Sequence, residues 1–316
     1  MNRRLILPRA WRHWVGPLML LVVLGVAAAA PRLAPQADPT QPQDFSQVGR
    51  GSDTTPHPPN GQAILGTLPM QYDVYYSLVW GLRQALHFGL LVTTLTGVFG
   101  MLYGALSGYL GGWVNNLLMR IADAFLAFPV LAAVVFVRQI MTILIGDPTQ
   151  SVFSGGMYVS VGLTPLQSLL MNADPLLWTL VALSWMPYAR LVNAGVLRLR
   201  QIDFVLATRA LGASHLRIML RHMLPNAISP AIVLAARDVG GMVILQATFT
   251  FIGLGGDNLW GYMLAIGRNW IVGPGGNPLV YWWTFVQVTL ALIFFSLNWN
   301  FLGASMNEWL NPRSAA

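Results

Sequence analysis

The sequence predicts an all-α, polytopic membrane protein with six transmembrane helices, and two observations indicate this class. Hydrophobic residues make up 55% and charged residues only 9% of the 316 residues, with a mean hydropathy of +0.57. A soluble domain carries about a quarter charged residues, because its core needs a polar shell. Six apolar stretches also approach the roughly 20 residues that a helix needs to cross the hydrocarbon core. Lipid is therefore the expected solvent for much of the surface.

The predicted spans are 14–30, 86–110, 117–138, 175–199, 225–251 and 281–302. The first follows a basic start and precedes a run of alanines, so a cleaved signal peptide is the alternative interpretation. A retained span is favoured because the later spans then orient consistently. Pro129 and Pro187 are expected to kink the third and fourth spans.

Arginine bias predicts the orientation of the chain in the membrane. With a cytoplasmic N-terminus, inner segments hold twelve arginines and outer segments hold five, which favours cytoplasmic ends. The predicted segments are a cytoplasmic arm (1–13), the first transmembrane helix (14–30), an outer segment (31–85), a transmembrane core (86–303) with an inner loop (203–224), and a cytoplasmic tail (304–316). Multi-pass insertion in a bacterial or archaeal plasma membrane is therefore the expected localisation.

Three outer segments differ in composition. Residues 31–60 are rich in Pro, Gln, Asp and Thr, which is typical of an extended tether. Residues 139–174 contain an apolar stretch, 161–171, that is expected to form an interfacial or re-entrant helix. Residues 253–278 are rich in Gly, Asn and Trp and predict a structured loop.

Two residue types are absent, and both absences restrict the chemistry. The chain has no Cys, so disulfides, thiolate metal sites and cysteine nucleophiles are excluded. All 18 basic residues are Arg, so a Walker A loop, which needs a Lys on the phosphates, is excluded as well. The scattered His residues have no ligand spacing, and we expect no metal site. The arginines lie between apolar segments rather than in one patch, so nucleic acid is not an expected partner.

The inner loop predicts two short amphipathic helices. Asp203 can cap the first, Gly212 can end it in the left-handed conformation, and Ser214 can cap the second. Small residues between these points leave a surface on which a partner can dock closely. Residues alone leave two alternatives open, a docking site and a basic interfacial loop that only fixes topology.

This loop resembles the EAA loop of ABC importer permeases, in the form found in the dipeptide/oligopeptide/nickel group, "C" type. The matching positions are Phe204, Val205, Ala207, Arg209, Ala210, Leu211, Gly212, Ala213, Ser214, Arg221, His222, Leu224, Pro225 and Asn226. Further motifs of the group match at 65–67, 108–114, 185–192 and 251–264, in the same order. Three positions depart from the group's pattern: Leu206 and Gln246 stand where it has Glu, and Thr208 where it has Ala.

The resemblance implies a type I ABC importer permease fold with cytoplasmic coupling helices. It implies a second homologous permease, two cytoplasmic ATPase subunits that bind ATP and Mg²⁺, and an extracytoplasmic solute-binding protein. No cofactor is then expected on this chain, and the solute is expected to be a peptide. The residues expected to contact an ATPase are Asp203, Phe204, Leu206, Ala207, Arg209, Ala210, Leu211, Gly212, Ala213 and Ser214.

Ionisable residues at membrane depth usually face the bundle interior. Asp123 lies near Arg120, and a structural pair at the inner interface is expected there. Arg237 and Asp238 point about 100° apart on a helix, so they cannot face one partner. We expect Arg237, Asp238 and Gln246 to line the translocation pathway or the seam with the second permease. An ion-coupled secondary transporter is the alternative function, but internal repeats and midplane carboxylates are not evident.

Overall fold

The structure is a computed structural model that describes residues 9–36, 45–49, 51–145, 151–154, 157–160, 164, 174–203, 208, 214–256, 258–273, 276–277 and 279–310. Its longer elements are α1 (Arg9–Leu33), α2 (Val74–Leu110), α3 (Gly112–Leu126), α4 (Val130–Ile145), α6 (Pro175–Leu183), α7 (Met186–Leu199), α11 (Ser229–Phe251), α12 (Leu259–Gly267) and α13 (Val286–Leu310). Shorter elements are η1 (Pro69–Gln71), β1 (Ser151–Ser154), β2 (Met157–Ser160), α9 (His215–Ile218), η2 (Met219–Met223), α10 (Leu224–Ala227), η3 (Arg268–Trp270) and η5 (Trp282–Thr284).

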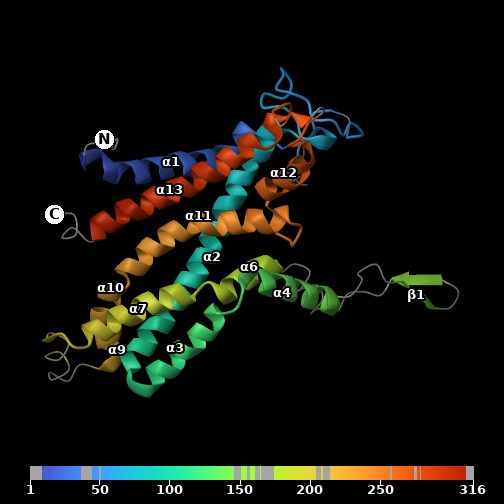
Figure 1. Cartoon of the computed structure of the whole chain (residues 1–316). Helices are drawn as coiled ribbons and strands as arrows, with labels where there is room; N and C mark the ends of the chain where they lie inside the picture. The colour runs from blue at the N-terminus through green and yellow to red at the C-terminus, as the bar shows by residue number, and fades with distance from the viewer. Residues whose placement is uncertain are drawn as a thin grey trace.

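Long apolar helices dominate the described residues and confirm the predicted class. Five spans are long and apolar enough to cross a membrane, and there are six if α3 and α4 together make one. The start of α1, the end of α13 and α9 lie at one end of the bundle, and the described residues of 45–73 lie at the other (Figure 1). Helices α1 and α13 run side by side (Figure 1). They meet closely, because a Cβ on Gly16 would lie 2.6 Å from the backbone nitrogen of Leu302.

Helix α2 begins at Val74, twelve residues before the predicted start of the second span at Leu86. Asp73 causes the earlier start, since its side chain accepts a hydrogen bond from Tyr75 N at 2.9 Å and caps the helix. Burial raises the pKa of this carboxyl, because the charged form loses hydration. At 37 residues, α2 is about 55 Å long, so it extends well beyond a hydrocarbon core of roughly 30 Å.

The segment before α2, expected to be an extended tether, is an ordered cap in its described residues from 45 onward. Its backbone pairs Gln47 with Tyr72 and Thr67 with Asp73. Gln71 holds a left-handed backbone (φ 59°), and its side chain accepts from Thr67 Oγ1 and donates to Thr55 O at 2.9 Å. The indole of Trp283 donates to Thr67 O at 3.2 Å, which ties the cap to the segment before α13.

The third span is broken. Helices α3 and α4 meet at an 80° bend at Pro129, where a gentle kink within one span was expected. Proline cannot supply the backbone N–H that would continue α3, so the helix ends three residues earlier. Similarly, the fifth span begins at Ser229 rather than Pro225, since a separate turn, α10, precedes it.

A two-stranded antiparallel hairpin, β1–β2, projects from the bundle within the outer segment 139–174 (Figure 1). No strand was expected in this segment. The pairing runs from Ser151 with Ser160 to Ser154 with Met157. The expected helix at 161–171 lies outside the described residues, apart from Thr164.

Candidate functional site

The predicted coupling segment is described only in part. Asp203, Thr208 and Ser214 are described, whereas 204–207 and 209–213, and with them Phe204, Leu206, Ala207, Arg209, Ala210, Leu211, Gly212 and Ala213, lie outside the described residues. Helix α7 leads into the segment and ends four residues before Asp203. The exit is helical, as expected after Ser214: α9 continues through a π-helical turn, η2, into α10. Such π turns occur often at functional sites.

Helix α7 lies directly on the backbone of α2. Three glycines of α2 at a spacing of four residues face three backbone carbonyl groups at the same spacing in and just before α7. The pairs are Gly100 with Trp185, Gly104 with Ala189 and Gly108 with Asn193. A Cβ on Gly100 or Gly104 would overlap the facing carbonyl oxygen, and one on Gly108 would lie 3.0 Å from Asn193 O. Small residues at this spacing allow two membrane helices to approach closely.

A buried polar cluster joins three helices next to this contact. Asn193 of α7 is 6% exposed, and its Nδ2 donates to Ser107 Oγ of α2 at 2.7 Å and to Asn115 Oδ1 of α3 at 2.5 Å. Ser107 Oγ in turn donates to Gly104 O at 3.0 Å. Near the end of α7, Arg200 Nη1 donates to Gly108 O at 3.2 Å. The start of the coupling segment is thereby fixed to the α2–α3 turn.

Asp123 pairs with Arg190 of α7 and not with Arg120, the partner expected from the sequence. The guanidinium Nε donates to Asp123 Oδ1 at 3.1 Å, and Nη2 contacts the same oxygen. A helix spacing of three residues made Arg120 a plausible partner, but the packing of α7 on α3 brings Arg190 to the carboxylate. Both side chains are about half exposed, so the pair adds little stability.

Arg237 and Asp238 face different helices, as their spacing requires. The Arg237 side chain lies against Gly303 of α13, where a Cβ would meet its Cγ at 2.5 Å. Asp238 Oδ2 instead accepts a hydrogen bond from Tyr188 Oη of α7 at 2.7 Å. Tyr188 is fully buried, so this bond lies within the subunit and connects the helices on either side of the coupling segment.

Gln246 lies eight residues further along α11, about 12 Å from Asp238 along the axis. Its side chain is 4% exposed and accepts from Asn258 Nδ2 at 2.8 Å, while Asn258 Oδ1 caps α12 at Gly261 N. The structure therefore does not bring the three pathway candidates together. Whether any of them lines a pathway stays a prediction.

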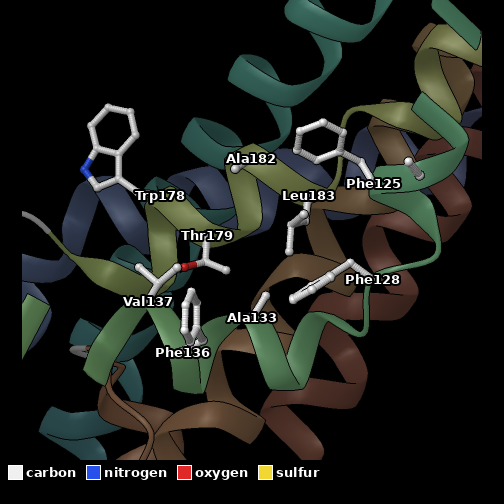
Figure 2. Close-up of a pocket in the computed structure, with 10 residues that line it drawn as sticks. Phe125, Phe128, Ala133, Phe136, Val137, Trp178, Thr179, Ala182 and Leu183 are labelled. Atoms are coloured by element: carbon white, nitrogen blue, oxygen red, sulfur yellow. The ribbon is translucent and has the colours of Figure 1, made fainter. Parts of the chain in front are cut away.

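An apolar cavity of about 460 Å³ lies at the break between α3 and α4. In Figure 2, Phe128 and Phe136 on one side and Leu183 and Thr179 on the other face a shared space. Among the described residues, no ionisable side chain lines it, and the Thr179 hydroxyl is already bonded to Pro175 O. The described lining residues are Ala124, Phe125, Phe128, Ala133, Phe136, Val137, Trp178, Thr179, Ala182 and Leu183.

Among the described residues, no group of three or more His, Asp or Glu side chains could hold a metal ion. Neither the contact of Tyr188 with Asp238 nor the buried cluster of Asn193 and Ser107 was expected from the sequence. One signal for the contact was present, because glycines at 100, 104 and 108 predict a close helix approach. The partner helix could not be read from that spacing.

Comparisons with known proteins found similar membrane permeases. A family model described as "binding-protein-dependent transport system inner membrane component" matches residues 100–315. The nickel transport system permease protein NikC of Escherichia coli K12 is 30% identical over 80% of each chain. A putative peptide transport system permease protein of Brucella suis is 29% identical over 98% of this chain and 90% of its own length.

Two further similarities were found. The probable D,D-dipeptide transport system permease protein DdpC of Escherichia coli K12 is 28% identical over 81% of this chain and 76% of its own length. Among solved structures, an inward-facing MetNI methionine ABC transporter covers 73% of this chain with a TM-score of 0.46 and 20% identity.

Proposed function

Because the chain belongs to the family of binding-protein-dependent transport system inner membrane components, we propose that it is the permease half of a peptide importer driven by a separate ATPase. The family match confirms the resemblance found in the sequence, and it sets aside the secondary transporter. The chain is a membrane permease subunit of an ABC importer, and ATP hydrolysis belongs to a partner.

The peptide solute is the finer part of the proposal. Permeases named for peptides or dipeptides support it, and NikC, named for nickel, makes nickel the second candidate. In the part of the chain that the structure describes, the cavity at the α3–α4 break has no ionisable lining group. Uptake by cells that express the complete system tests the solute: we expect excess dipeptide, and not excess Ni²⁺, to compete with a labelled dipeptide. Uptake of labelled Ni²⁺ without uptake of the labelled dipeptide would favour the second candidate.

We propose further that residues 203–214 dock on one of two cytoplasmic ATPase subunits, beside a second homologous permease and below an extracytoplasmic binding protein. ATP and Mg²⁺ would bind only to the ATPases. Small side chains in the segment and its helical exit support docking. Leu206 replaces the acidic group of the EAA pattern, so shape and apolar packing would dominate this contact. The start of α1 and the end of α13 lie at the same end of the bundle as α9, which supports a cytoplasmic location for both termini (Figure 1).

Co-purification tests the docking. The unmodified chain is expected to bring down an ATPase subunit. Ala210→Trp places a bulky side chain on the small surface and should abolish this, whereas Gln62→Trp, an exposed position in the outer cap, should not. Retention of the ATPase by Ala210→Trp would contradict the proposed docking site.

A further inference from the structure

We infer that α7 is a rigid relay and that Tyr188 and Asn193 are positioning residues that connect the coupling segment to α11 and α3. The inference rests on the proposed docking of the segment on an ATPase. It concerns contacts within this chain, which the comparisons do not assign.

Tyr188 joins the two arms of the coupling segment at membrane depth. The first arm continues from α7 and the second leads through α10 into α11. The 2.7 Å bond from Tyr188 Oη to Asp238 Oδ2 connects these two helices. Few competing partners exist in a lipid environment, so a polar contact between helices holds them in one arrangement. Displacement of either arm is thereby passed to the other.

The glycine contact prevents α7 from sliding on α2. At Gly100 and Gly104 no side chain separates the two backbones, and the carbonyl groups of Trp185 and Ala189 fill the space of a missing Cβ. Closely packed interfaces change between discrete arrangements rather than deforming continuously. A push on α7 therefore moves α2 as well.

Asn193 extends the same unit to α3. Its single amide nitrogen uses both hydrogens, one for Ser107 and one for Asn115, so it fixes α2 and α3 at one point. Beyond the break at Pro129, α4 packs mainly on α6 and is not held by this cluster. The relay thus comprises α2, α3, α7 and α11, and it ends at the α3–α4 bend.

Two reporter cysteines test the relay in the intact complex of this chain with its partner permease and ATPases, in nanodiscs. Because the chain has no Cys, a single substitution gives it one thiol. The two reporter variants are Thr248→Cys on α11 and Asn116→Cys on α3, and both positions are exposed. The measurement is the rate of maleimide labelling before and after trapping with ATP, Mg²⁺ and vanadate.

We expect trapping to change labelling at both reporters. Tyr188→Phe should remove most of the change at position 248 and leave position 116 responsive. Asn193→Leu should remove most of the change at position 116 and leave position 248 responsive. Ser107→Ala is milder, because Asn115 remains as an acceptor, and it should remove part of the change at position 116. A purely structural role would lower the yield of complex without this separation of the two reporters.

Two matched variants serve as controls. Asp238→Asn keeps an oxygen that accepts from Tyr188 and should respond like the parent protein. Thr179→Val removes one buried hydroxyl whose bond lies within α6, and it should affect neither reporter.

The relay is wrong if Tyr188→Phe and Asn193→Leu leave both reporters responsive, or reduce both equally. It is also wrong if Asp238→Asn behaves like Tyr188→Phe, since the charge would then matter and not the bond. If the parent complex itself shows no response to trapping, ATP coupling fails, and the proposed function fails with it.

Discussion

The contact of α7 with α2 and the contact of α4 with α6 join helices of the same membrane core by different means. The first brings backbones together at Gly100 and Gly104 and adds buried polar bonds through Asn193. The second consists of apolar side chains around a cavity of about 460 Å³, and it leaves Phe136 61% and Trp178 53% exposed. The close backbone contacts and buried hydrogen bonds therefore lie next to the predicted coupling segment, whereas the α4–α6 side presents an apolar surface to its surroundings.

This difference has a physical cause. Lipid tails are as apolar as leucine, so apolar contact alone does not drive one membrane helix onto another. Close backbone approach and hydrogen bonds determine which helices pair, and within the described residues both are features of the α7–α2 contact and not of the α4–α6 contact. The changes in the free energy of unfolding caused by substitutions at the two contacts should therefore differ in size and in sign.

The largest effect is expected for Gly104→Leu. The side chain would overlap Ala189 O, and no flexible group can move aside, so α7 must separate from α2. We expect a loss of about 3 kcal/mol in the free energy of unfolding, the upper end for overpacked interiors. Thermal unfolding in detergent micelles measures it. Gly241→Ala, where a Cβ meets nothing within 4 Å, is the control and should change little.

Ala182→Leu tests the opposite side. It adds methylene groups to the cavity at the α3–α4 break, where space is available. The expected result is neutral to stabilising, by at most about 2 kcal/mol. The same unfolding measurement applies. A loss as large as that of Gly104→Leu would remove the distinction between the two contacts.

Arg190→Gln is expected to have a smaller effect. The Arg190–Asp123 pair joins α7 to α3, but both groups are about half exposed, and exposed pairs contribute about 0.2–1 kcal/mol. The loss should shrink at high salt because ions screen the pair. A salt-independent loss of several kcal/mol would place the pair among the specific contacts.

The smallest effect is expected at the N-terminal end of α2, away from both contacts. Burial raises the pKa of Asp73 in the folded chain, so the folded state holds its proton more tightly than the unfolded state. Stability should fall as pH rises through the pKa of Asp73, and not as pH falls. Asp73→Asn keeps the cap and removes this slope. Melting temperatures of both proteins from pH 3 to 7 measure the difference, and parallel curves would contradict the prediction.

Much of the architecture could be predicted because lipid imposes strong patterns. Apolar runs located the candidate spans, of which the structure has five, or six if α3 and α4 make one, and the motif around Arg209 to Ser214 indicated the family. Helix ends were less accurate, because they depend on single caps and breaks. Asp73 starts α2 early, and Pro129 turns one expected span into two helices 80° apart.

The motif indicated residues 203–214 as a docking segment, which stays a prediction, and it indicated none of the contacts that hold the ends of this segment to the bundle. Those side chains come from distant positions in the sequence. Asp123 pairs with Arg190 rather than Arg120, and Gln246 accepts a hydrogen bond from Asn258 within the subunit. Sequence spacing describes neighbours on one helix, whereas these partners are set by how different helices pack.

The sequence by itself determined that this chain spans a membrane, hydrolyses no ATP through a Walker A lysine, and belongs to the importer permeases. Composition decides the first, since a chain with so few charges cannot cover a core in water, and local motifs decide the others. Only the tertiary structure decided that α7 lies on the glycines of α2 and reaches α11 through Tyr188 and α3 through Asn193. These pairings join residues 50 to 86 positions apart, and helix crossing, which no local pattern encodes, brings them together.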